Sequence, residues 1–504
     1  MVAGDTRRRP HGRAVAGGVA GGLAILWAAL GHDGSAGIYV LFSAATIALI
    51  ASAFVRPHSY GFVALVVFLT LGFWVKHAAW SIAGIPPIEP LGDFTGEAHE
   101  WDRALSFTAV ALLGLTLAKL SLYPLRMSRP GPVARVLPTW YERAPLLVWV
   151  ATAMLVIAGN VLNWRYRFYQ VAVHERVILP FHLNAVIVWW LTVATSMWLA
   201  VLLEFERRRR GFTRRWMILS APILEAVVTS AVMLSRGFYL MRTLPYALVF
   251  ARPSLRRSFQ LSRVVVPTLA VATVLGFVIS LAGASWLRLT VFPPMVTPGQ
   301  PAQAGAPQAP PADAGVGPTG RIPSAAEVRA AIREIGTMVV GRWIGLEGIL
   351  AISASHQQGL GLFVAGLMED PRSGTEALFQ RISKAEYKEL EGFTFMTLPG
   401  IVAVLAYSGS PVIIFAGMFL AGIVVLLTER AFRHAFDNDL LCAVVGVFMA
   451  NAIVQMNFPY LTAVFFIEMW GSLLILWILC RLDIGGRSAD RKVGALAASS
   501  TATP

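Results

Sequence analysis

A short stretch from Gly341 to Gly348 (Gly-Arg-Trp-Ile-Gly-Leu-Glu-Gly) places one arginine and one glutamate among glycines and large apolar residues. A guanidinium binds phosphate through a fork of N–H donors, and a carboxylate can accept a proton from a hydroxyl. Arg342 and Glu347 are five residues apart, so they do not stack on one helix face and can address different groups. The stretch is therefore the first place in the chain where we expect chemistry.

Further ionisable side chains lie within or beside apolar stretches, where charge is costly and marks functional candidates. His356 follows the motif and could accept a proton near neutral pH. Glu225 could be a functional carboxylate or an internal partner of an arginine. The basic candidates for binding an anion are Lys76, Arg165, Arg236 and Arg242. Lys76 could instead extend to the aqueous face, and Arg236 could cap helix carbonyls.

Metal, redox and nucleotide chemistry have no support in the sequence. No cluster of His, Asp and Glu has the spacing of metal ligands, and there is neither a P-loop nor a dinucleotide-binding glycine motif. The two cysteines, Cys442 and Cys480, both lie inside apolar stretches and form no zinc or disulfide pattern. We therefore expect no cofactor.

The elements that must hold these residues are membrane helices. The 504 residues are 56% hydrophobic and 14% charged, whereas a soluble domain carries about 25% charge. Apolar stretches of about 20 residues recur along the chain and are continuous rather than alternating, which favours helices over a barrel. The predicted fold is an all-α polytopic membrane protein with about 12 transmembrane helices and one long helical extracytoplasmic loop.

Four regions follow from this pattern. An N-terminal membrane domain (1–287) precedes the loop (288–409), a C-terminal membrane domain (410–482) and a cytoplasmic tail (483–504). The predicted spans are 14–31, 36–55, 60–84, 104–124, 144–163, 181–203, 217–235, 237–251, 264–286, 410–428, 440–456 and 460–481.

The charge distribution predicts the orientation of these spans. Successive spans cross the membrane in alternate directions. With the N-terminus inside, the loops on the inner side are rich in arginine, whereas the loop 85–102 carries five acidic residues and no Lys or Arg. The positive-inside rule then places both termini in the cytoplasm and the long loop outside. The net charge of +14 thus indicates topology rather than binding to nucleic acid.

The long loop has internal organisation. Residues 293–320, rich in Pro, Ala, Gln and Gly, predict a flexible linker. Ser324 and Glu327 form a capping box that predicts a helix running towards Arg342. Amphipathic helices at 359–369 and 375–391 should lie on the membrane surface. The apolar stretch 393–409, interrupted by Pro399-Gly400, favours a re-entrant segment, with a thirteenth span as the alternative.

The architecture and several local sequences resemble bacterial polysaccharide polymerases of the O-antigen polymerase (Wzy) type, whose relatives are the O-antigen ligases. The similar sequences are Gly72-Phe-Trp-Val-Lys76, Asn163 to Pro180, Ser235-Arg236-Gly237, Gly341 to Gly348, and Leu398-Pro-Gly400 leading to Tyr407-Ser-Gly409. The insert at 293–320 is not part of the pattern.

The resemblance implies transfer of a glycan from undecaprenyl diphosphate to a hydroxyl of a second lipid-linked repeat unit, at the outer face of the membrane and without metal. It implies catalytic roles for Arg342, Glu347 and His356. Arg236, Lys76, Arg242 and Arg165 would bind the substrate, and Trp343 and Tyr407 could stack on sugars or be interfacial aromatic residues. The implied partners are the lipid-linked oligosaccharide, membrane lipid, a chain-length regulator and a flippase.

Three alternatives remain open. An O-antigen ligase or another lipid-linked glycosyltransferase would use the same donor class with a different acceptor. A polysaccharide or lipid transporter belongs to another class, but the sequence shows no internal repeat and its ionisable residues favour one face. A non-catalytic assembly protein is the third.

Overall fold

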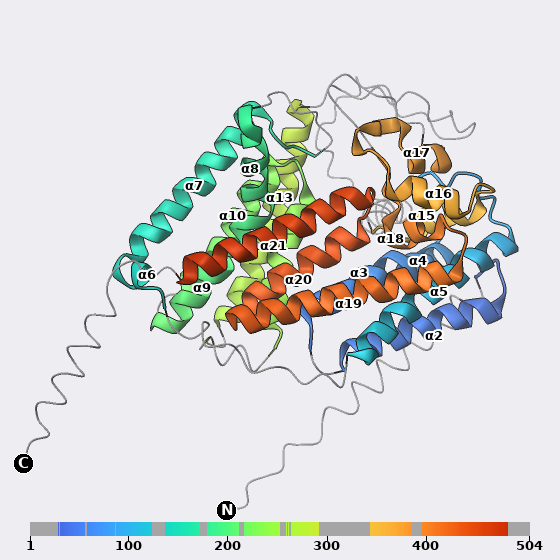
Figure 1. The fold of residues 1–504 in the computed structure, drawn as a ribbon, viewed down its shortest axis with the longest axis horizontal. Helices are drawn as coiled ribbons and strands as arrows, with labels where there is room; N and C mark the ends of the chain where they lie inside the picture. Colours follow the sequence, from blue (N-terminus) through green and yellow to red (C-terminus); the bar gives the residue numbers. More distant parts are fainter. Residues whose placement is uncertain are drawn as a thin grey trace, which may run out of the picture.

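The computed structural model describes residues 29, 31–55, 58–85, 87–122, 137–171, 179–210, 216–252, 259, 261, 264–291, 343–385 and 396–481. This part of the chain is helical and contains no strand (Figure 1). Eight of its helices are long and apolar enough to cross a membrane. They are α2 (Ala36–Ala53), α3–η1–α4 (Tyr60–Ala83), α5 (Ala98–Ser121), α7 (Pro145–Tyr166), α8–η4–α9 (Leu183–Arg209), α13 (Val265–Ala284 of Val265–Val291), α19 (Pro411–Phe436) and α21 (Pro459–Arg481).

Shorter helices complete the bundle. They are α6 (Thr139–Arg143), the 3-10 turns η3 (Pro180–His182) and η5 (Trp216–Ser220), α10 (Ala221–Val232), α11 (Arg236–Phe250) and α20 (Asp439–Val454). Each predicted span from 36–55 onward corresponds to a described helix, whereas 14–31 lies outside the described residues. The helical membrane class is therefore confirmed. The count of twelve spans stays a prediction.

The buried helix α20 organises the packing. It contacts α3, α9, α11, α18, α19 and α21, and most of its residues are buried. Its crossing with α3 is close because two glycines meet there: a Cβ on Gly446 would collide with the backbone nitrogen of Gly61. Small residues at a crossing let helix backbones approach in a membrane, where dispersion contacts rather than water drive association.

Two long helices contain a π-helical segment. In Tyr60–Ala83 the segment η1 (Thr70–Val75) separates α3 (Tyr60–Leu69) from α4 (Lys76–Ala83). In Leu183–Arg209 the segment η4 (Trp190–Ala194) separates α8 (Leu183–Trp189) from α9 (Thr195–Arg210). A π-helical turn changes the hydrogen-bond register and is often found at functional sites.

The described part of the predicted outer loop forms a layer over one end of the bundle, beside α4 and α5 (Figure 1). It contains α15 (Leu346–Ala354), α16 (Leu360–Leu367), the 3-10 turn η6 (Pro371–Glu376), α17 (Leu378–Ser383) and α18 (Gly400–Ala406). With seven residues, α18 is about 10 Å long, far short of a hydrocarbon core of about 30 Å. It does not cross a membrane by itself.

Several expectations for the loop need correction. The predicted helix 375–391 ends at Ser383, because Lys384 adopts a left-handed conformation with φ of 54°. The helix α15 was not predicted, and all nine of its residues are buried rather than lying on a membrane surface. By contrast, α16 exposes Leu360, Val364 and Met368. The linker 293–320, the helix from Ser324 and the tail 483–504 lie outside the described residues.

Candidate functional site

The π-helical segment η1 lies where the helix Tyr60–Ala83 meets the layer formed by α15 to α18, which is called the outer layer below because it covers one end of the bundle. Residues Trp343 to Gly345 lie against it, and a Cβ on Gly72 would collide with the carbonyl oxygen of Ile344. Gly345 has a φ of 155°, a conformation that side chains rarely adopt, and a Cβ on it would lie 2.9 Å from the Gly72 carbonyl oxygen. Glycine at both positions is therefore required for this approach.

Lys76 and Glu347 form a buried ion pair at this junction. Lys76 follows η1 directly, and Glu347 lies in the first turn of α15. The Lys76 Nζ atom lies 2.5 Å from each carboxylate oxygen of Glu347 and donates a further hydrogen bond of 2.6 Å to the carbonyl oxygen of Trp343. Both residues are only 5% exposed. One ammonium thus ties a membrane helix to the start of the outer layer.

The carboxylate of Glu347 is under-coordinated for its depth. Its Oε1 atom has no hydrogen-bond partner among the described residues. Burial raises the pKa of this carboxyl, and the opposing effects of the Lys76 charge and hydrogen bond do not cancel it. A buried carboxyl with a raised pKa, whose charge is balanced by a single ammonium, has the properties of a group that exchanges a proton.

A pair of histidines lies near the same end. His77 Nε2 lies 3.2 Å from His32 Nδ1, and Trp101 and Tyr39 pack around both rings. Burial lowers the pKa of His32, with the Asp102 and Asp33 carboxylates opposing it. The contact between the two histidines was not predicted from the sequence, because 45 residues separate them.

The other predicted site residues are dispersed. Arg342 lies outside the described residues, and the side chain of Arg236, at the start of α11, is not described. Trp343 contributes its carbonyl group rather than its ring to Lys76. Tyr407 is buried, and its ring covers Gly366.

Two further candidates lie on the surface. Arg165 is exposed in the last turn of α7, with its guanidinium 5.9 Å from the ring of Tyr166. His356 is exposed in the turn after α15. Among the described residues, the structure thus brings Lys76 and Glu347 together with the backbone of Trp343.

Arg242 belongs to a separate polar cluster within the bundle. It is 1% exposed and pairs with Glu225, and it also donates to the carbonyl oxygen of Leu191 in η4. Glu225 accepts a second hydrogen bond of 2.7 Å from Thr229. The alternative that Glu225 is an internal partner of an arginine thus matches the geometry. Arg242 has no exposed surface to offer a ligand in this arrangement.

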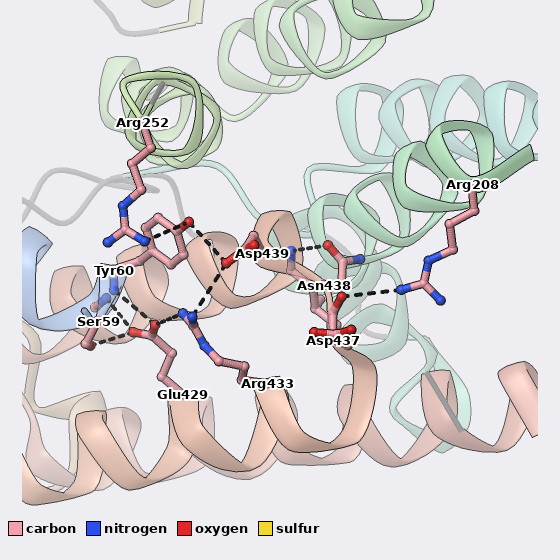
Figure 2. Close-up of polar contacts among 11 residues, drawn as sticks. Ser59, Tyr60, Arg208, Arg252, Glu429, Arg433, Asp437, Asn438 and Asp439 are labelled. Atoms are coloured by element: carbon pink, nitrogen blue, oxygen red, sulfur yellow. Dashed lines mark hydrogen bonds and ion pairs between the residues drawn. The ribbon is translucent and has the colours of Figure 1, made fainter. Parts of the chain in front are cut away.

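A second dense polar network lies at the opposite end of Tyr60–Ala83 (Figure 2). Glu429 of α19 accepts hydrogen bonds from Ser59 Oγ at 2.6 Å, from the Tyr60 N–H at 3.0 Å and from the Gly61 N–H at 2.9 Å. Arg433 donates a fourth, at 2.9 Å. This carboxylate caps the first turn of α3, where backbone N–H groups have no partner within the helix.

The ring of Tyr60 connects this network to two further helices. Its hydroxyl donates to Asp439 at 3.2 Å, and the guanidinium of Arg252 lies 4.4 Å from the ring. Asn438 caps α20 through a hydrogen bond from the Leu441 N–H and donates to the Ala200 carbonyl oxygen. These contacts cap helices or tie one helix to another, which is the pattern of a structural network (Figure 2).

Comparisons with protein-family models, curated proteins and solved structures found no match for the chain. Among the described residues, no group of three or more His, Cys, Asp and Glu side chains is placed to hold a metal ion.

Proposed function

We propose that this chain is a polysaccharide polymerase that joins undecaprenyl-diphosphate-linked oligosaccharide repeat units at the outer face of a bacterial inner membrane. The observation that carries the proposal is the buried pair of Lys76 and Glu347, which joins a membrane helix to the outer layer. It unites two sequences that resemble such polymerases, Gly72 to Lys76 and Gly341 to Gly348.

The chemistry of the proposed reaction suits this place. The hydroxyl oxygen of the acceptor sugar attacks the anomeric carbon of the donor glycan, and the bond to the lipid diphosphate breaks with its electron pair on the diphosphate. The hydroxyl proton passes to a base, for which Glu347 is the candidate with a buried, under-coordinated oxygen. Arg342 lies five residues before it in sequence, and a guanidinium would stabilise the charge that develops on the diphosphate.

The proposal is tested by deleting the gene in the strain that carries it and separating the surface polysaccharide on a gel. The deletion is complemented with wild type, Arg342→Ala, Glu347→Gln or the control Glu376→Gln, which changes an exposed glutamate of the same layer. We expect the deletion to lose long chains and accumulate single repeat units. Wild type and Glu376→Gln should restore the chains, and the other two variants should not.

Two outcomes would replace the proposal. Full-length chains that stay on the lipid carrier in the deletion strain would identify a ligase, because elongation would then be intact while transfer fails. A glycan unchanged in length and amount would remove glycan assembly as the function and leave transport as the next class to test.

A further inference from the structure

Lys76 was expected to contact the diphosphate of the substrate, but its surroundings are filled by the protein. An ammonium has three N–H bonds, and the Glu347 carboxylate and the Trp343 carbonyl oxygen take at least two of them. The side chain is 6% exposed. A phosphate would have to displace a carboxylate 2.5 Å away in order to reach it.

We infer that Lys76 is a positioning residue, which favours the ionised form of the Glu347 carboxylate, orients it towards the acceptor hydroxyl and does not bind the diphosphate. The inference rests on the proposed function, because it assigns Lys76 and Glu347 roles in that reaction. It also predicts a coupling between the two side chains that is measurable without any substrate.

The geometry gives Lys76 two tasks. Its bond to the Trp343 carbonyl oxygen fixes the backbone three residues before Leu346, the first residue of α15, and its contact with Glu347 fixes the carboxylate itself. The contact of Gly72 with Ile344 places this backbone at the right distance from η1. The Oε1 atom of Glu347 is buried and lies 2.5 Å from the Lys76 Nζ atom, but it accepts no hydrogen bond from the described residues, and we assign it to the acceptor hydroxyl.

The charges around Glu347 are few. Lys76 of α4 favours its ionised form, and Glu89 of the loop before α5 opposes it. The packed helix α18 contains no ionisable residue. On α5, Arg103 contacts the far end of α15 at the Ser353 carbonyl oxygen, and α17 carries Arg381 at its last turn. Lys76 is therefore the cation whose removal should change the Glu347 carboxyl most.

The test uses the purified full chain in proteoliposomes, with lipid-linked repeat units extracted from the deletion strain as substrate. The rate of chain growth is measured against pH and donor concentration for wild type, Lys76→Met and Lys76→Arg. In Lys76→Met the acidic limb of the pH profile should move to higher pH by about 1 to 3, since an opposite charge at this distance shifts a carboxyl pKa by that amount. The KM for the donor should change less than threefold.

Lys76→Arg preserves the charge and should return the limb close to its wild-type position. A Lys76→Met profile that keeps its acidic limb while the donor KM rises tenfold or more would overturn the inference, because Lys76 would then be a diphosphate ligand. If Lys76→Met does not fold, the donor KM of Lys76→Arg decides, because this variant keeps the charge. A donor KM within threefold of wild type supports the inference, and a donor KM raised tenfold or more makes Lys76 a diphosphate ligand.

An infrared titration separates this inference from the proposed function. The protonated-carboxyl band that disappears in Glu347→Gln is followed against pH without substrate. It should titrate at higher pH in Lys76→Met and be unchanged in Lys119→Met, a control that removes another buried lysine. If the wild-type protein fails to join repeat units, the proposed polymerase function is refuted. If the Glu347 carboxyl band titrates at the same pH in Lys76→Met as in wild type, the coupling between Lys76 and Glu347 is refuted.

Discussion

The two ends of the helix Tyr60–Ala83 each meet a buried glutamate from elsewhere in the chain, and the two glutamates are held in opposite ways. At the Tyr60 end, Glu429 is 2% exposed and accepts four hydrogen bonds, two of them from backbone N–H groups. At the Lys76 end, Glu347 has Lys76 as its partner and one oxygen without a hydrogen bond among the described residues.

The number of hydrogen bonds that each glutamate accepts is a guide to whether its charge is structural or functional. A fully satisfied buried network is rigid and has little capacity for a ligand. An under-satisfied buried carboxylate carries a desolvation cost that folding alone does not require. The comparison therefore supports a structural role for the Tyr60 end and the proposed chemical role for the Lys76 end.

The largest expected effect is on chain growth in Glu347→Gln. Loss of a proton-accepting group reduces a rate by about 100- to 10,000-fold, so long polysaccharide should disappear in the complementation assay. The double variant Lys76→Met/Glu347→Gln should be equally inactive yet stably folded, because no buried charge is left unpaired. An active double variant would remove the chemical role of this end.

The next effect is on stability at the Tyr60 end. Glu429→Gln should destabilise the protein by about 3 kcal/mol or more, because Arg433 loses its buried partner and the α3 cap weakens. Adding Arg433→Met should not restore stability, because a neutral side-chain amide at position 429 accepts the hydrogen bonds of Ser59, Tyr60 and Gly61 less well than the carboxylate does. Thermal unfolding in detergent measures both variants. The double variant Lys76→Met/Glu347→Gln is expected to keep its stability. If Glu429→Gln/Arg433→Met also regained the melting temperature of wild type, the two ends would not differ in the way that we propose.

Gly72→Ala should separate the outer layer from η1. The added methyl group would collide with the Ile344 carbonyl oxygen, and such overpacking costs about 1–3 kcal/mol. Because Glu347 would move away from Lys76, chain growth should fall as well. Gly361→Ala is the matched control in the same layer, as its Cβ would meet nothing within 4 Å. Equal behaviour of the two variants would show that the close approach is unimportant.

A smaller effect is expected in the pH dependence of stability. Because the pKa of Glu347 is raised in the folded protein, its carboxyl binds a proton more tightly there than in the unfolded chain. Its contribution to stability is therefore complete below the ordinary pKa of 4.5 and is lost as pH rises through the raised value. Melting temperatures of wild type should show this decline, and those of Lys76→Met/Glu347→Gln should not.

The smallest effect is expected for the exposed pair of Lys384 and Asp93. The hydrogen bond and charge of Lys384 lower the pKa of Asp93, so the contribution of the pair is present at neutral pH and lost as pH falls through that lowered pKa. Solvent and salt screen such pairs. Lys384→Ala should leave the neutral-pH melting temperature within experimental scatter, and a clear drop would mean that this contact fastens the outer layer.

The sequence by itself determined the membrane class and the positions of most helices. Apolar stretches such as 36–55 and 460–481 coincide with α2 and α21 to within two residues, because backbone groups in lipid must be paired within the helix. It also marked Lys76 and Glu347 as candidates, because charge near apolar stretches is costly enough to be noticed residue by residue.

Only the tertiary structure decided which of these charges meet. Lys76 and Glu347 are 271 residues apart, and no periodicity connects them. The same holds for Glu429 with Ser59 and for Arg242 with Glu225, whose pairing turned a predicted substrate ligand into a buried internal contact. The end of α17 at Lys384 also depends on its surroundings, since a left-handed residue other than glycine has no sequence signature. Which charged side chains form pairs is determined by the packing of the helices, and packing brings together segments that are distant in sequence.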